Sequence, residues 1–254
     1  LWLKSLVQGD LGLSYRTGQP VVTMIAQRVV PSLILTGTGV AAAILLGIPL
    51  GVMAAWKPKS GWGKLAGGLT LLSFSAPGFF LCVLAIFLFS VVLGWLPAAG
   101  MYSAGGGGSV GDLLLHLILP AGVVCLSSLG NLVRQTASAC GEVLGEDYIR
   151  TARAKGLPEW AVVWKHGFRT ALLPVVTTIL NHIPHIIGGS LIVERIFGWP
   201  GMGSLLFTSV SSRDYTVIMG LTVVIALTVL ATGILMDLVY RLADPGVGWG
   251  GEAR

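Results

Sequence analysis

Two histidines, His182 and His185, lie three residues apart in a run of apolar residues, and Ser190 follows them. Residues three apart share one face of a helix, so both imidazoles could contact the same polar group or metal ion. Two imidazoles are too few for a dedicated metal site, and Pro184 between them distorts the helical spacing. We expect these three residues to line a hydrogen-bonded pathway, with packing, or brief contact with a metal or metal chelate, as the alternatives.

Other chemical motifs are weak or incomplete. Gly37, Gly39 and Ala42 fit a loose dinucleotide-binding pattern, but no strand precedes them, and helix packing is the favoured interpretation. Gly63-Lys64 lacks the earlier glycine and the following hydroxyl residue of a phosphate-binding loop. Ser190 has no nucleophile motif around it, which argues against an intramembrane hydrolase. We therefore expect no catalytic residue, no metal site and no cofactor in this chain.

Asp237 stands near the end of the last apolar run. A carboxyl group there could relay protons, as in a secondary transporter. A single acidic residue does not make a relay, so we expect it to be hydrated or paired near the membrane interface. A proton-coupled carrier and an intramembrane enzyme remain the alternatives to the function inferred below.

The composition is that of a membrane protein. Hydrophobic residues make up 54% of the 254 residues even before the 36 glycines are counted, and charged residues only 11%. Soluble domains have about 45–50% apolar residues with glycine included and about 25% charged residues. The net charge of +5 comes without interleaved aromatic residues, which argues against nucleic acid as a partner. Cys82, Cys125 and Cys140 lack metal-ligand spacing and are expected to be reduced packing residues.

Long stretches without a charged residue predict the membrane-spanning helices. A crossing needs about 20 apolar residues, and five stretches are long enough. The second is long enough for two crossings, but its end is rich in glycine, including Gly105 to Gly108, and is interpreted as a loop after one span at about Leu65 to Leu93. We expect one all-α domain, residues 1–254, with about five transmembrane helices. The stretches are residues 29–56, 65–111, 113–133, 170–193 and 215–236.

The lysines and arginines predict the orientation, because basic loops stay preferentially on the cytoplasmic side. With the segment before Val29 outside, most of them fall in three inner regions, residues 57–64, 134–169 and 241–254. The outer basic residues are then few: Lys4, Arg16, Arg28, Arg195 and Arg213. This pattern places the 134–169 connection and the C-terminus in the cytoplasm.

Proline and glycine positions predict how the spans bend and pack. Proline removes a backbone hydrogen bond and bends a helix. Small residues four apart, such as Gly47 and Gly51, let two helices approach closely. The prolines expected to bend the spans are Pro49, Pro77, Pro120, Pro174 and Pro184.

The connection between Arg134 and Arg169 is the most polar part of the chain. Good helix formers predominate from Glu142 to Lys155, Gly156 can end a helix in the left-handed conformation, and Pro158 can begin another. Helical spacing would place Trp160, Val163 and Trp164 on one apolar face. Such a helix could lie in the membrane interface or dock a cytosolic partner, and this pattern alone favours neither.

Several ordered motifs resemble those of one transporter family across nearly the whole chain. DYIRTARAKGL, from Asp147 to Leu157, resembles the cytoplasmic-loop signature of permeases in the dipeptide, oligopeptide and nickel ABC importer family. The further matches are GDLGLSYRTGQPV at Gly9 to Val21, ILPA at Ile118 to Ala121, IGGSLIVERIFGWPGMG at Ile187 to Gly203, RDYTVI at Arg213 to Ile218, and D-x-x-Y-x-x-x-D-P within Leu235 to Pro245.

The resemblance implies the type I ABC importer permease fold, without its usual first helix, in the bacterial cytoplasmic membrane. It also implies a coupling loop, residues 138–170, that fits a cleft in a cytosolic ATPase subunit. The partners implied are a second homologous permease, two ATPase subunits that bind ATP, and an extracytoplasmic solute-binding protein. The implied cargo is a peptide, nickel or a metal chelate. The implied coupling residues are Asp147, Tyr148, Arg150, Ala152, Arg153, Ala154, Lys155, Gly156, Leu157 and His166.

Overall fold

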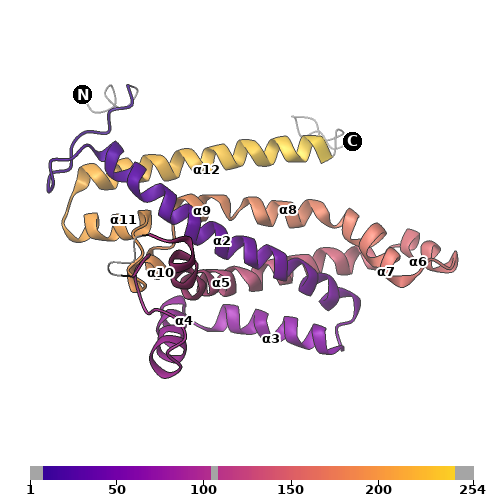
Figure 1. Ribbon diagram of the computed structural model, residues 1–254. Helices are drawn as coiled ribbons and strands as arrows, with labels where there is room; N and C mark the ends of the chain where they lie inside the picture. The colour runs from indigo at the N-terminus through magenta and orange to yellow at the C-terminus, as the bar shows by residue number, and fades with distance from the viewer. Residues whose placement is uncertain (1–7, 104–107, 244–254) are drawn as a thin grey trace.

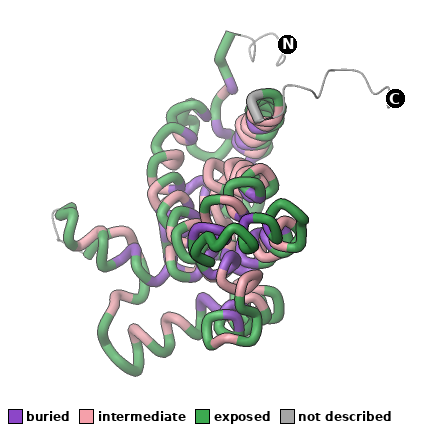
Figure 2. Tube along the Cα trace, turned by 90° about the vertical axis from the view of Figure 1, so that its right-hand side faces the viewer, coloured by how far each residue is buried: buried purple, intermediate pink, exposed green. Residues whose placement is uncertain are grey.

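A computed structural model describes residues 8–103 and 108–243 of the chain, with side chains described as far as Arg241. Its long elements are the helices α2 (Val21–Trp56), α5 (Val110–Leu144) and α12 (Tyr215–Ala243), which run along one elongated bundle (Figure 1). Seen along the bundle, buried residues gather between the helices and exposed residues cover the outside (Figure 2). Lys4, Gly105 to Gly107, Pro245 and Arg254, which entered the sequence predictions, lie outside the described residues.

Helices α2 and α5 pack along a seam of glycines. They contain 36 and 35 residues, or about 54 and about 52 Å at roughly 1.5 Å per residue, and so exceed the roughly 30 Å of a hydrocarbon core. A Cβ added at Gly51 would lie 2.5 Å from Thr136 Cβ, and one at Gly47 would lie 3.0 Å from Leu132 Cβ. The close approach predicted from these two glycines is confirmed.

The predicted span from Leu65 to Leu93 is a sharply bent pair of helices. Helix α3 (Gly61–Ser75) meets α4 (Gly78–Ala85) and its π-helical continuation η1 (Ile86–Val92) at 108°. Pro77 explains the break, because it has no N–H for the helix and favours an extended residue before it. Ala76 has that extended conformation, with φ −91° and ψ 123°.

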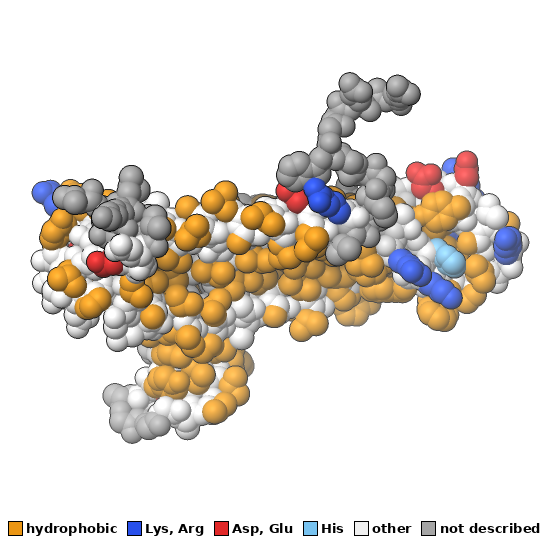
Figure 3. All heavy atoms as spheres, turned by 90° about the horizontal axis from the view of Figure 1, so that it is seen from above, with side chains coloured by type: hydrophobic (Ala, Val, Ile, Leu, Met, Phe, Trp, Pro, Cys, Tyr) orange, Lys and Arg blue, Asp and Glu red, His pale blue; other side chains and the backbone are white. Residues whose placement is uncertain are grey.

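Apolar helices long enough to cross a membrane make up the body of the bundle. Four described segments qualify, and the bent pair gives a fifth if it counts as one crossing. A band of hydrophobic side chains runs along the surface between charged ends (Figure 3). The predicted all-α bundle of about five membrane helices is confirmed.

The fourth crossing, Leu172–Ile196, is broken into three short helices. These are α8 (Leu172–Leu180), α9 (Ile183–Gly188) and α10 (Leu191–Ile196). Pro174 and Pro184 lie in the first turns of α8 and α9, where a missing N–H costs little. Pro49 and Pro120 instead lie inside α2 and α5, as predicted.

The ends of the bundle carry different short elements. One end holds α6 (Asp147–Ala154), α7 (Glu159–Ala161) and the π-helical segment η2 (Val162–Phe168). The turn between α2 and α3 and the C-terminal end of α12 lie toward that same end (Figure 1). The opposite end holds α11 (Met202–Ser211). The described basic regions that the sequence assigned to one side of the membrane are therefore on one side of the fold.

Candidate functional site

A polar cavity of about 290 Å³ lies inside the bundle at the broken crossing. It brings together His182, His185 and Ser190, the three residues that the sequence grouped as a possible pathway. Hydroxyl groups from two other helices complete its polar lining. The lining residues are Thr36 and Val40 of α2, Val124, Ser127 and Ser128 of α5, and His182, His185, Gly189, Ser190 and Val193 of the broken crossing.

The break at Gly189 shapes one wall of this cavity. Gly189 ends α9 with φ +76°, a left-handed conformation that favours glycine. The Thr36 hydroxyl is 2.6 Å from both the Ser32 and the Ile186 carbonyl oxygens, which ties α2 to α9. Non-helical backbone at membrane depth is tolerated where it is buried in protein or lines a cavity. The interruption of this crossing therefore fits a polar pathway better than a lipid-facing helix.

The two histidines form a pair without a third metal ligand. Their ring centroids are 6.5 Å apart, and Nε2 of His182 is buried with no hydrogen-bond partner among the described residues. No cluster of three or more His, Cys, Asp or Glu side chains that could hold a metal occurs in the described part of the chain. The pair therefore presents imidazole hydrogen-bonding groups to the cavity.

The 138–170 segment contains the expected helix, turn and helix, but the first helix begins at Asp147 and not at Glu142, because α5 ends at Leu144 and Gly145 and Glu146 separate the two. Helix α6 ends before Gly156, whose φ is +76°, and Pro158 precedes α7. Nε of Arg153 donates a hydrogen bond of 2.9 Å to Oε1 of Glu159 across the turn. Arg153, one of the implied coupling residues, thus has a hydrogen-bond partner within the chain.

One face of this segment packs inward, and the other is exposed. Ile149, Ala152 and Val162 form a small core with the end of α5. Ala152, one of the implied coupling residues, is only 9% exposed in this core. Tyr148, Leu157 and Trp160 point outward with 45%, 40% and 64% of their surface exposed. Asp147, Arg150, Ala154 and Lys155 are exposed as well.

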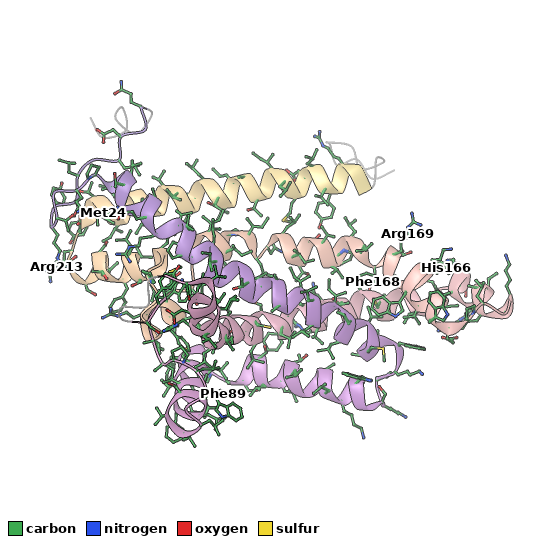
Figure 4. All side chains as sticks on the ribbon, viewed as in Figure 1. Met24, Phe89, His166, Phe168, Arg169 and Arg213 are labelled. Carbon is green, nitrogen blue, oxygen red and sulfur yellow. The ribbon has the colours of Figure 1, made fainter. Side chains whose placement is uncertain are left out.

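The second helix of the segment departs from α-helical spacing. Residues Val162–Phe168 are π-helical, which rotates the chain relative to an α-helix. Val163 is buried while Trp160 is exposed, so the apolar face predicted for Trp160, Val163 and Trp164 is not a single face. His166 is half-buried in this π-helical stretch and lies near Phe168 and Arg169, at the end of the molecule opposite Arg213 (Figure 4).

A buried carboxylate network lies beside the cavity, and the sequence reasoning did not find it. Glu194 is fully buried, accepts a hydrogen bond of 2.7 Å from the Ser32 hydroxyl, and accepts one of 2.9 Å from the Ser204 N–H. The Ser32 hydroxyl oxygen in turn accepts a hydrogen bond of 2.7 Å from the Met202 N–H. Ser32 of α2 and Glu194 of α10 thus cap the first turn of α11 together.

Three glycines make room for this carboxylate. A Cβ at Gly189 or Gly201 would lie 2.3 or 2.4 Å from a Glu194 oxygen, and one at Gly203 would lie 3.1 Å away. Gly189 also lines the cavity, so the network supports the cavity wall. The signal that could have identified it is a lone acidic residue at the end of an apolar run, flanked by closely spaced glycines.

Comparison with known families matches residues 47–249 to the model described as binding-protein-dependent transport system inner membrane component. A putative peptide permease protein of Brucella suis is 43% identical over 97% of this chain and 77% of its own length. An oligopeptide transport system permease protein of Bacillus subtilis is 42% identical over 97% of this chain and 78% of its own length. A glutathione transport system permease protein of Pectobacterium atrosepticum is 39% identical over 97% of this chain and 77% of its own length.

Two solved structures share the fold. A chain of an amino acid ABC transporter crystallised with histidines has a TM-score of 0.63 and 14% identity, covering 87% of this chain and 94% of that one. A chain of the inward-facing methionine ABC transporter has a TM-score of 0.63 and 17% identity, covering 86% of this chain and 97% of that one. At sequence identities this low, the two structures show only that the fold, the arrangement of the helices, is shared.

Proposed function

Because the chain belongs to the family of binding-protein-dependent transport system inner membrane components, the permease subunits of ABC importers, we propose that it carries peptides across the bacterial cytoplasmic membrane. It is a transport subunit and not an enzyme, since ATP hydrolysis in such importers resides in separate subunits. Support for peptide cargo comes from the relatives, which are named as peptide, oligopeptide and glutathione permeases. Nickel or a chelate stays a prediction that the His182 and His185 pair alone favours.

The 138–170 segment is the proposed coupling loop, and its exposed apolar surface is the observation that carries this role. Tyr148, Leu157 and Trp160 project from a segment whose inner face is already packed against α5. Exposed aromatic and aliphatic side chains on a well-anchored element are typical of anchors that fill a partner's pocket. We assign them to a cleft in a cytosolic ATPase, with the segment facing the cytoplasm.

The mechanism follows from this coupling. A second homologous permease pairs with this chain, two ATPase subunits hold the two coupling loops, and an extracytoplasmic binding protein delivers cargo. ATP-driven closure moves the loops together and turns the pathway outward, a rigid-body change between two states. The cavity at His182 offers hydrogen-bonding groups to the peptide as it crosses.

Reversing one charge of the coupling turn tests the assignment. In the reconstituted importer, Arg153→Glu is expected to lower the ATPase rate stimulated by the loaded binding protein about fivefold. The reason is that two carboxylates would then face each other across the Gly156 turn. The ion pair is about half exposed and contributes no more than about 1 kcal/mol, so folding should be retained. Thermal unfolding measured alongside the ATPase rate checks this.

The charge-swapped double variant, Arg153→Glu with Glu159→Arg, sharpens the test. Recovery of stimulation means that the pair acts by holding the turn, whereas persistent loss means that Arg153 itself contacts the ATPase. Lys59→Glu, in the exposed turn between α2 and α3, is the matched control and should behave as wild type. Equal stimulation in all variants would argue against the coupling role.

Removing a polar group from the cavity tests the pathway. His182→Leu is expected to lower peptide uptake into proteoliposomes about fivefold while the stimulated ATPase rate changes less, because a buried hydrogen-bonding group is lost without touching the coupling loop. Ile183→Leu, next to it but outside this cavity, is the control. Uptake by His182→Leu at the wild-type rate would remove His182 from the pathway.

A further inference from the structure

Three exposed arginines stand at the end of the bundle opposite the coupling loop. Arg16 lies in the turn before α2, Arg195 in α10, and Arg213 between α11 and α12. Figure 4 shows Arg213 at this end, far from His166 and Arg169. None of the three forms an ion pair within the described part of the chain. A pocket of about 280 Å³ is lined here by Arg16, Arg195, Phe207, Thr208, Ser211 and Ser212.

The acidic residues next to these arginines in the sequence are turned inward. Glu194 binds the Ser32 hydroxyl and the start of α11 instead of a guanidinium group. Asp214, only 3% exposed, accepts hydrogen bonds from the Ser14 hydroxyl and the Tyr15 N–H. Burial acts to raise the pKa of Asp214, but these bonds, with others from backbone N–H groups, outweigh it and hold that pKa below its usual value. The carboxylates are satisfied internally, and the positive charges remain on the surface.

Contacts and backbone conformation constrain the positions of the three arginines. The Arg195 guanidinium stacks over the Phe207 ring at 4.8 Å. Asp214 binds the backbone of Tyr15 and Arg16 and so fixes the turn that carries Arg16. Arg213 has φ +58°, a conformation that is uncommon for a residue other than glycine. Three separate chain segments thus present one basic surface.

The pocket selects a hydrogen-bond acceptor. The hydroxyls of Thr208, Ser211 and Ser212 each donate to carbonyl oxygens of their own helix. The donors left for a ligand are therefore the guanidinium N–H groups, whose planar fork matches a carboxylate. An acidic side chain is the group that this surface fits.

We propose that Arg16, Arg195 and Arg213 form a docking surface for acidic side chains of the extracytoplasmic binding protein. This rests on the proposed function and its orientation, which place these residues outside. A partner protein fits better than cargo, because the arginines lie on the exposed end and none of them lines the polar cavity at His182. Their separation over three segments suits the broad surface of a protein, and the family description makes transport depend on a binding protein.

The affinity of the binding protein for the reconstituted importer tests this docking surface. The binding protein of the same transport system is titrated onto importer in nanodiscs of zwitterionic lipid, and Kd is read from fluorescence anisotropy. Arg16→Glu with Arg195→Glu is expected to raise Kd about a hundredfold at low salt, and less at about 500 mM salt, where charges are screened. The Arg16→Lys with Arg195→Lys variant keeps the charge but loses the fork, and should raise Kd about tenfold.

Folding and alternative ligands are separated by further measurements. Arg213→Asn, which keeps the positive φ accessible, should raise Kd a few-fold while the Tm of the importer stays at its wild-type value. If Arg16→Glu with Arg195→Glu leaves Kd unchanged, while the binding protein still stimulates the ATPase of the wild-type importer, the docking surface is overturned but the proposed function is not. Reduced peptide uptake at unchanged Kd also overturns it, in favour of a cargo carboxylate. A wild-type importer that the binding protein does not stimulate would instead overturn the proposed function itself.

Discussion

Glu194→Ala is expected to destabilise the folded protein by about 3–5 kcal/mol, because two buried donors lose their acceptor. The substitution leaves the Ser32 hydroxyl and the Ser204 N–H without their acceptor in a fully buried site. A buried donor left without its hydrogen-bond partner costs about 1–3 kcal/mol. Thermal unfolding in detergent, followed by tryptophan fluorescence, should show a lower Tm and reduced yield of folded protein.

The amide substitution separates the charge from the hydrogen bonds. Glu194→Gln keeps one acceptor oxygen for the Ser32 hydroxyl but sets an NH₂ group against the Ser204 N–H, so an intermediate loss is expected. Glu142→Ala, which removes an exposed carboxylate at the other end of the bundle, is the control and should leave Tm unchanged. A Tm for Glu194→Ala equal to that of the control would show that α11 does not depend on this cap.

Gly51→Ala is expected to destabilise the bundle by about 2–3 kcal/mol through a single added methyl group. That methyl carbon would lie 2.5 Å from Thr136 Cβ and 2.8 Å from the Val133 carbonyl oxygen, so α2 and α5 would have to separate. The seam joins the two longest helices, and the strain cannot be relieved by rotating one flexible side chain. Unfolding in detergent, measured by circular dichroism, gives the change in stability.

The same substitution in α3 is the matched control. A Cβ at Gly67 meets nothing within 4 Å, so Gly67→Ala should be neutral or more stable by up to about 1 kcal/mol, the helix-propensity difference between the two residues. If the added methyl group destabilises the protein at Gly51 but not at Gly67, the loss of stability at Gly51 comes from the contact between α2 and α5. If Gly51→Ala were as stable as Gly67→Ala, the close packing of α2 on α5 would be wrong.

Local features of the coupling loop could be predicted because they depend on neighbouring residues. Gly156 was expected in a left-handed conformation and has φ +76°, and Pro158 was expected to begin the second helix. The outward position of Trp160 could not be predicted, because the π-helical turn that starts at Val162 depends on packing against α5. Ala152 likewise looks like a surface residue in the sequence, and only its neighbours Ile149 and Val162 place it inside.

The residues that line the polar cavity were likewise only partly predictable from the sequence. His182, His185 and Ser190 could be grouped because they are close in the sequence, and the structure places all three on one cavity. Thr36, Ser127 and Ser128 gave no such signal, since they lie far from the histidines in the sequence, within two other apolar helices. Their approach to the histidines depends on where α2 and α5 cross the broken span.

The sequence by itself determined that this chain spans a membrane, which connection is the most basic and polar, and to which family of permeases it belongs. These follow from hydrophobicity, charge spacing and ordered motifs, which are properties of the chain before it folds. The tertiary structure alone decided the inward turn of Ala152 and the pairing of Glu194 with Ser32, 162 residues away. The physical reason is that a buried polar group is satisfied by whichever partner packing brings within hydrogen-bonding distance, and spacing along the chain does not reveal that partner.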